Sequence, residues 1–243
     1  MEENEDAYGR QMYDYLKGRR GAPEIVERDD GFISVSAGAK FYFAEYKDWD
    51  GRERKAMRHV RGRVLDVGCG AGRVSLYLKN KGFYALGVDV SPLAIHVSKT
   101  RGLKNARVMP ITKISSKLGK FGTIIMFGNN FGLFGNPHRA KWLLKRFHRL
   151  TTDNARIIVE SLDPYKTNDP DHLEYHRFNK RRGRMPGQVR IRVRYRKYVT
   201  PWFDYLLVSK QEMRNILNGT GWGIERTLTS SKSPAYVAII EKH

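Results

Sequence analysis

The stretch VLDVGCGAGR at residues 64–73 constrains the fold more than any other part of the chain. It runs from apolar residues and an acid into three glycines at alternate positions, and an amphipathic segment follows at 74–78. A short apolar run that ends in glycine predicts a buried strand, and the helical period after it predicts a helix. Glycine at such a junction lets the backbone turn sharply and lets a ligand approach main-chain atoms. The stretch therefore predicts the first strand, turn and helix of an open α/β sheet, with a ligand at the turn.

A second acid favours a nucleoside as that ligand. The apolar run 85–88 ends in Asp89, and an acid at the tip of the second strand holds ribose hydroxyls in nucleoside-binding sheets. The loop reads G-x-G-x-G, whereas a dinucleotide site has G-x-G-x-x-G, and Asp66 just before the loop would repel a pyrophosphate. An acid there suits a cofactor that carries an ammonium and a sulfonium group, as S-adenosylmethionine (SAM) does. The alternative is a glycine-rich turn in an α/β protein of another kind.

The segments LDVGCGAG and GVDVS resemble the first and second motifs of the class I SAM-dependent methyltransferases. The segments DYLKG, ERDDG, GNNFGLFG, DPY, PGQVRIRVRY and PWFDYLL are similar to those of a group of prokaryotic methyltransferase-domain proteins, over nearly the whole chain. The resemblance implies an α/β fold with a Rossmann-like, seven-stranded mixed sheet and helices on both faces. It implies methyl transfer from SAM, with S-adenosylhomocysteine (SAH) as the product, and it implies no particular substrate.

The resemblance also assigns the cofactor contacts. The methionine end is expected near Asp66, Gly68 and Gly70, and the ribose at Asp89. The adenine is expected against Ile111, because Pro110-Ile111-Thr112 lacks the acid that many relatives place after the third strand. The full set of expected cofactor-binding residues is Asp66, Gly68, Cys69, Gly70, Arg73, Asp89, Val90, Ile111, Gly128 and Asn129.

Candidates for the reaction itself follow the fourth and fifth predicted strands, 123–127 and 155–160. Ligands bind at the carboxyl ends of strands in an open α/β sheet, and there the chain places Asn129, Asn130, Asp163 and Tyr165. The two asparagines have an alternative role, since asparagine often satisfies the backbone of a turn. None of the four has the features of a general base, which is needed only if the nucleophile arrives protonated. The catalytic residues are therefore left open.

Residues 1–60 are expected to form an arm, and residues 61–243 the methyltransferase domain. An apolar stripe near the start of the arm predicts a helix, and the aromatic-rich segment 32–46 follows it. Aromatic residues ahead of the first strand suit a lid over the cofactor and substrate, and they suit packing against the sheet equally well. The arm is thus described as helical and aromatic, with both roles open.

An insertion is expected at about 166–208. Its two histidines, His172 and His176, would share one helix face, but no third ligand stands at a recognisable spacing, so no metal site is expected. Residues 189–196 alternate strictly, which predicts a strand with one apolar face and a row of arginines, and 202–208 predict the return strand of a protruding basic β-hairpin. The row could bind successive phosphates or be a solvated edge that opposes aggregation. Its members are Arg190, Arg192, Arg194 and Arg196.

The net charge of +20 makes this a basic protein and attracts polyanions, although charge alone selects no partner. No apolar run approaches the ~18 residues of a membrane span, and the single cysteine excludes an internal disulfide, so a cytoplasmic protein is expected. Three functions stay open in this order: a methyltransferase for a small molecule, a methyltransferase for RNA that docks through the arginine row, and a SAM-binding protein without turnover. The oligomeric state is not indicated by the sequence.

Overall fold

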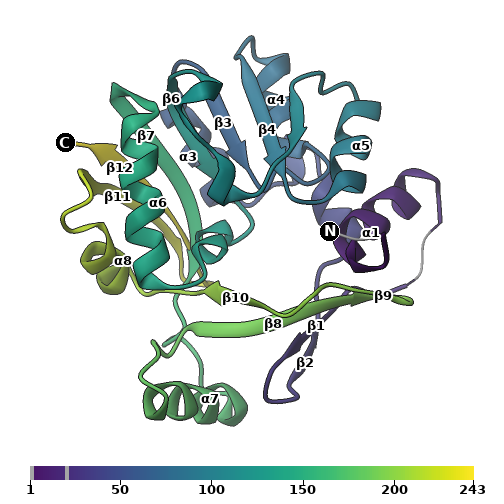
Figure 1. Ribbon diagram of the computed structural model, residues 1–243, viewed down its shortest axis with the longest axis vertical. Helices are drawn as coiled ribbons and strands as arrows, with labels where there is room; N and C mark the ends of the chain where they lie inside the picture. Colours follow the sequence, from purple (N-terminus) through teal and green to yellow (C-terminus); the bar gives the residue numbers. More distant parts are fainter. Residues whose placement is uncertain (1–2, 20–21) are drawn as a thin grey trace. The chain divides into compact units, whose positions relative to one another are not determined.

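The computed structural model of the chain describes residues 3–19 and 22–243. Its larger sheet is built from β3 (Val64–Val67), β4 (Ala85–Asp89), β5 (Ala106–Val108), β6 (Phe121–Met126), β7 (Thr151–Leu162), β11 (Trp222–Ser230) and β12 (Ser233–Lys242). The seven strands lie in the order β11-β12-β7-β6-β3-β4-β5 (Figure 1). The pairs β3/β4, β4/β5 and β6/β7 are parallel, whereas β12 is antiparallel to both β7 and β11. The expected α/β fold with a seven-stranded mixed sheet is confirmed.

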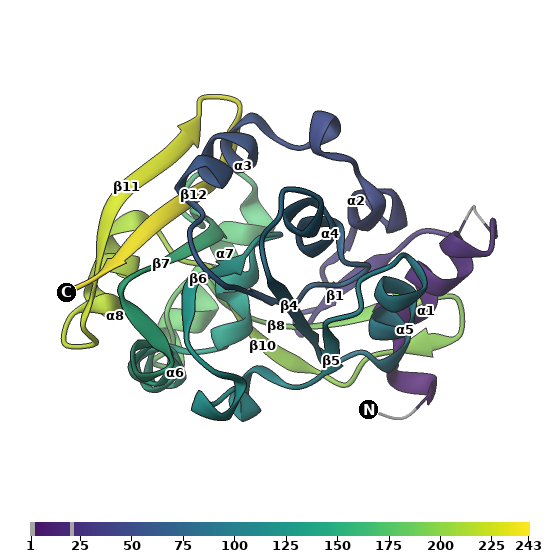
Figure 2. The same ribbon diagram turned by 90° about the horizontal axis from the view of Figure 1, so that it is seen from above.

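The helices begin and end where local chemistry allows it. They are α1 (Ala7–Leu16), α2 (Ala39–Phe43), α3 (Gly51–Ala56), α4 (Arg73–Asn80), α5 (Pro92–Thr100), α6 (Pro137–Arg149), α7 (Pro170–Arg181) and α8 (Lys210–Leu217). Ser91 caps α5, with proline at the first helical position, and Ser209 and Glu212 form the capping box of α8. Figure 2 shows α3 and α6 on opposite sides of β7 and β12, so helices cover both faces of this part of the sheet.

The chain divides into two compact units. The first consists of Met1–Trp49, Gly62–Ile114 and Ile191–Phe203, and the second of Asp50–Arg61, Ser115–Arg190 and Asp204–His243. The units are interleaved along the sequence. The boundary between an arm and a methyltransferase domain at residue 60 stays a prediction.

A second sheet joins the arm to the insertion. It contains β1 (Ile25–Arg28), β2 (Ile33–Val35), β8 (Gln188–Tyr195), β9 (Tyr198–Val199) and β10 (Phe203–Leu206). The order is β10-β8-β1-β2, with β9 also paired to β8. The alternation predicted for β8 is real, because Ile191, Val193 and Tyr195 are buried. The hairpin is present, but it does not protrude by itself, since β8 is an interior strand with β1 antiparallel to it.

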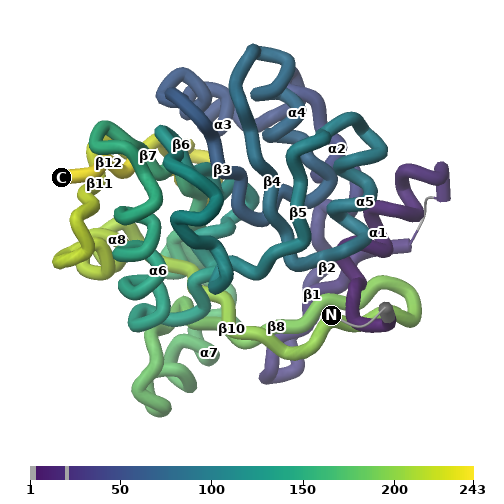
Figure 3. The backbone as a smooth tube through the Cα atoms, turned by 45° about the horizontal axis from the view of Figure 1, so that its top comes forward, coloured from purple at the N-terminus to yellow at the C-terminus, as the bar shows by residue number. Residues whose placement is uncertain are grey.

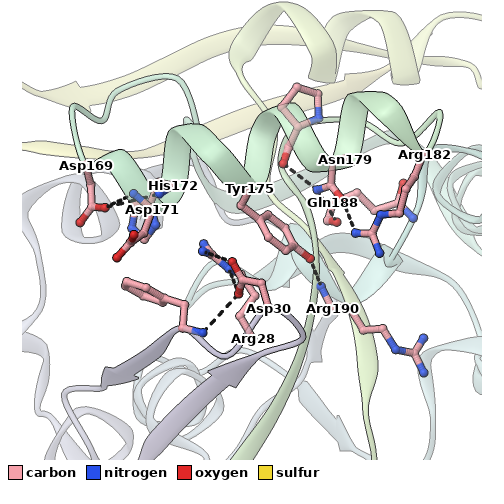
Figure 4. A network of polar contacts seen from close by, with 12 residues as sticks. Arg28, Asp30, Asp169, Asp171, His172, Tyr175, Asn179, Arg182, Gln188 and Arg190 are labelled. Carbon is pink, nitrogen blue, oxygen red and sulfur yellow. Dashed lines mark hydrogen bonds and ion pairs between the residues drawn. The ribbon is translucent and has the colours of Figure 1, made fainter.

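The helix α7 packs on the first residues of β8 through two buried polar side chains (Figure 4). The hydroxyl of Tyr175 accepts a hydrogen bond from the backbone N–H of Arg190 at 3.1 Å. The Asn179 amide donates to the carbonyls of Pro186 and Gln188, each at 3.0 Å. Because buried polar groups need partners, these bonds fix α7 to the strand that follows it.

Candidate functional site

The glycine loop after β3 adopts a conformation that glycine favours. Gly68, Gly70 and Gly72 have φ angles of 73°, 52° and 81°. The N–H groups of Gly68 and Cys69 both donate to the carbonyl of Val88, at 2.8 and 3.1 Å, which ties the loop to β4. A side chain is disfavoured at these positions whatever the space, because L residues rarely adopt positive φ. The loop therefore presents bare backbone at the carboxyl end of β3.

Asp89, the last residue of β4, is bonded to this loop. Its Oδ2 accepts from the N–H of Gly70 at 2.9 Å, and its Oδ1 accepts from the N–H of Ser91 at 2.9 Å. Burial raises the pKa of the Asp89 carboxyl, and the nearby charge of Asp6 adds to the rise. A carboxylate oxygen accepts up to two hydrogen bonds. Each oxygen of Asp89 can therefore also accept from a ligand hydroxyl.

Asp66 lies deeper, within β3. It is 3% exposed, and its Oδ2 accepts a hydrogen bond from the Ser75 hydroxyl of α4 at 2.7 Å. Burial raises the pKa of Asp66 to about 6, and the Ser75 hydrogen bond and the positive charge of Arg73 oppose that rise. Asp66 thus sits close to its titration point near neutral pH, at the base of the glycine loop.

The aromatic segment of the arm packs on α4. The Arg73 guanidinium lies over the rings of Phe41 and Trp49, 4.4 and 4.7 Å from their centroids. The rings of Tyr46 and Tyr77 stack at 4.3 Å with an angle of 8° between their planes. Aromatic faces attract a guanidinium, so these contacts hold Arg73 in place. The packing role of the aromatic segment is present in the structure, and its role as a lid stays a prediction.

The helix α1 lies on α5 and on the glycine loop (Figure 3). Met12 is buried in a cluster with Ala71 of the loop and with Ala94 and Val97 of α5. A Cβ built on Gly70 would lie 3.3 Å from Met12 Cε and 3.4 Å from Tyr42 Cδ1. The arm therefore covers the loop with side chains from two helices, α1 and α2.

Three other expected cofactor residues also lie in the first unit, in different surroundings. Cys69 is buried against Ile95, Leu103 and Ala106, and burial raises the pKa of its thiol well above the ordinary value, which suits packing. Val90, directly after Asp89, is 48% exposed and offers an apolar surface beside the acid. Ile111 begins a 3₁₀ turn at Ile111–Lys113 and is half-buried.

The second unit holds Gly128 and Asn129, directly after β6. Both backbone N–H groups donate to Oε2 of Glu160, at 2.7 and 3.1 Å. The Tyr205 hydroxyl donates to the carbonyl of Asn129 at 2.7 Å. The backbone of Asn129 is left-handed, with φ 61°, and its side-chain Oδ1 is buried with no partner among the described residues. The loop is thus held from both sides, and one amide oxygen is left unpaired.

Glu160 was not among the residues expected from the sequence. It lies near the end of β7 and is 8% exposed. Burial raises the pKa of its carboxyl, and the charge of Glu53 adds to the rise, while the two backbone N–H bonds and Arg52 oppose it. An acid at the tip of a buried strand is the signal that identified Asp89, and it could have identified Glu160 as well.

The other expected residues of the second unit have structural partners. Asp163 Oδ1 accepts from the backbone N–H of Tyr165 at 3.1 Å. The Tyr165 hydroxyl donates to Glu212 at 2.7 Å, and its ring lies 5.9 Å from that of His176. Asn130 is the first residue of a 3₁₀ turn, Asn130–Phe134. None of these contacts assigns a catalytic role, which stays a prediction for all three.

The arginine row of β8 is paired with acids. Arg192 and Arg194 both bond to Glu27 of β1, at 2.8 and 2.5 Å. Arg190 lies 3.6 Å from Asp204, and Arg196, in the turn after β8, lies 3.7 Å from Asp14. The hydrogen bonds from Arg192 and Arg194 lower the pKa of Glu27 to about 2. The row therefore presents less net positive charge than the sequence alone indicates.

Metal-ligating side chains do not gather in groups of three or more anywhere in residues 3–19 and 22–243. No helix in that part of the chain combines the length and apolarity that a bilayer crossing requires.

The residues of the first unit fit SAM. Asp89 keeps acceptor capacity for ribose hydroxyls, Val90 offers an exposed apolar surface next to it, and the loop leaves backbone accessible at Gly68 and Gly70. Asp66 is an acid at the base of the loop, as a cationic methionine end would require.

This fold and this loop define the class I SAM-dependent methyltransferases. The structure of a SAM-dependent methyltransferase from Bacteroides fragilis, in complex with SAH, is similar with a TM-score of 0.84 and 23% sequence identity. The match covers 100% of this chain and 97% of that one. Residues 64–154 match the family model described as a methyltransferase domain. The chain has the class I fold, and residues 64–154 belong to the methyltransferase domain family.

The curated relatives act on different kinds of acceptor. A 2-heptyl-1-hydroxyquinolin-4(1H)-one methyltransferase from Mycobacteroides abscessus is 43% identical over 72 residues, which are 27% of this chain and 32% of the relative. A lysine N-methyltransferase of ATP synthase from Homo sapiens is 30% identical over 119 residues, which are 49% of this chain and 50% of the relative. The chain thus spans a third to a half of the length of these relatives.

Proposed function

We propose that the protein is a SAM-dependent methyltransferase whose acceptor is a small molecule. The observation that carries the proposal is the bonding of Asp89 to the glycine loop at Gly70, which puts a ribose-binding acid beside bare backbone. The methyltransferase domain at 64–154 and the class I fold support it.

The cofactor, when bound, supplies a methyl group already activated on a sulfonium. The chain then has to bind the cofactor, align the acceptor with the methyl–sulfur bond and exclude water. In this proposal Asp66, Gly68, Gly70 and Arg73 hold the methionine end, and Asp89 holds the ribose hydroxyls. The adenine lies against the apolar surfaces of Val90 and Ile111, with Cys69 packed beneath the loop.

The Gly128–Asn129 loop is the proposed acceptor side. Glu160 uses Oε2 for two backbone N–H groups, and no hydrogen bond to its Oε1 occurs among the described residues. The unpaired Oδ1 of Asn129 is likewise an acceptor. Two unused hydrogen-bond acceptors favour a substrate that presents N–H or O–H groups. The quinolone methyltransferase among the relatives supports a small molecule, and the lysine methyltransferase supports an amine.

RNA is the second candidate acceptor. Its support is the net charge of +20 and the partial exposure of the Arg190, Arg194 and Arg196 side chains, at 46%, 40% and 45%. The ion pairs with Glu27, Asp204 and Asp14 weigh against it. SAM binding without turnover is the third candidate.

The location and the arm complete the proposal. We place the protein in the cytoplasm, for which the support is one buried, unpaired cysteine. Residues 1–60 serve as an arm and lid for a methyltransferase domain at 61–243. The contacts of Met12 and Tyr42 with the glycine loop support the lid.

Transfer of a labelled methyl group from SAM into an extract of the source cells tests the function. The extract is separated into RNA, protein and low-mass fractions, and label is expected in the low-mass fraction. Label in RNA would replace the small molecule by RNA and make the arginine row a docking surface. No label in any fraction, with SAM still bound in a calorimetric titration, would favour the third candidate.

A further inference from the structure

Gln11 is a buried amide without hydrogen bonds. The residue lies in α1 and is 3% exposed, and neither Nε2 nor Oε1 has a partner among residues 3–19 and 22–243. Burying an amide without its hydrogen bonds destabilises a folded chain. The position therefore carries a cost that no contact in the described chain offsets, and a ligand that pairs with both ends of the amide would offset it.

The surroundings of Gln11 connect it to the glycine loop. Met12, the next residue, is the side chain that lies against Gly70. Nε2 of Gln11 lies 3.6 Å from a Cβ built on Gly38, the residue that caps α2, and Tyr42 of α2 also lies against Gly70. Gln11 thus sits between the two helices of the arm that cover the loop.

We propose that Gln11 binds the amino-acid end of SAM. The inference rests on the proposed function and names a residue that neither the glycine loop nor the acids supply. A carboxamide donates through Nε2 and accepts through Oε1, and the amino-acid end carries one carboxylate and one ammonium group. Ionised Asp66 and Asp89 accept only, so they cannot bond to that carboxylate. Gln11 supplies a donor for the carboxylate and an acceptor for the ammonium group together.

The experiment compares two ligands on Gln11→Leu. SAH carries the amino-acid end, and 5′-methylthioadenosine has the same nucleoside without it. Both are titrated calorimetrically into the wild-type protein, into Gln11→Leu and into the control Gln211→Leu. Gln211 is an exposed glutamine of α8 whose Nε2 donates to Asn215. Gln11→Met serves as a second variant of similar volume.

Gln11→Leu is expected to weaken SAH binding roughly tenfold or more, because a hydrogen bond to a charged group is lost. Its affinity for 5′-methylthioadenosine is expected to stay within about twofold of the wild type. The ligand-free variant is expected to melt at a higher temperature, because two unpaired buried groups are gone. The control should match the wild type in all three measurements.

Unchanged SAH affinity in both Gln11 variants would overturn the inference. An equal loss for both ligands would also overturn it, because Gln11 would then act through the shape of the arm. If the wild-type protein binds neither ligand, the proposed function fails, and the inference fails with it.

Discussion

Asp6 is expected to stabilise the fold more than an ordinary helix cap. Its Oδ1 accepts from the N–H of Gly9, as an N-cap does for α1, and its Oδ2 accepts from the Ser91 hydroxyl and the Leu93 N–H of α5, at 2.8 and 3.1 Å. Asp6→Ala removes the cap, worth about 1 kcal/mol, and leaves two further donors without their acceptor, at about 1 kcal/mol each. We expect a loss of about 3 kcal/mol in the free energy of unfolding.

Asp169→Ala is the matched control. Asp169 caps α7 from an exposed position and bonds only to the first backbone N–H groups of its own helix. Its loss should cost about 1 kcal/mol. In urea denaturation with a slope of roughly 2–3 kcal/mol per M, the midpoint should fall by about 1 M for Asp6→Ala and by about 0.4 M for the control. Equal shifts would refute the idea that Asp6 joins the two helices.

Three further outcomes follow from the acids. Asp89→Ala should reduce SAM affinity at least about a hundredfold in a calorimetric titration while the circular dichroism spectrum stays that of the wild type, and unchanged affinity would remove Asp89 from the site. The raised pKa of Asp66 means that the folded chain holds its proton longer than the unfolded chain, so its contribution to stability falls as pH rises from 3.8 to about 6. Asp66→Asn should lack that slope in urea titrations at each pH, and an identical slope would contradict the shift. The pKa of Glu27 is lowered to about 2, so its contribution is present above pH 4.5 and is lost as pH falls toward 2. The stability difference between the wild type and Glu27→Gln should shrink over that range, and a constant difference would show that the pairing with Arg192 and Arg194 contributes nothing.

The sequence predicted the larger sheet well because its signals are local. The glycine loop, the acid at Asp89 and the capping box at Ser209 each lie within a few residues of the element they define. Glu160 was missed although its signal was local, because an acid at the end of an apolar run was interpreted only as the end of a strand.

The second sheet could not be predicted in the same way. The strand β1 is four residues long and contains two charged residues, so it lacks the alternation that identified β8. Its partner lies far away in the sequence, and no local pattern specifies a partner. The arginine row was consequently considered without Glu27, which neutralises part of it. Gln11 is a polar residue in an amphipathic helix, and the burial of its amide depends on α2, which the sequence did not place.

The pairing of β1 with β8 has a consequence for how the chain folds during synthesis. Glu27 and Arg192, opposite each other in the two strands, are 165 residues apart. At roughly 5–20 residues per second, a ribosome takes about 10–30 s to make the second strand after the first. Until then β1 and β2 lack the interior strand of their sheet, and Ile33 and Val35, already more than half exposed in the finished fold, remain open to other strands. The first thirty-five residues are therefore among the last to become secure, although they are the first to be made.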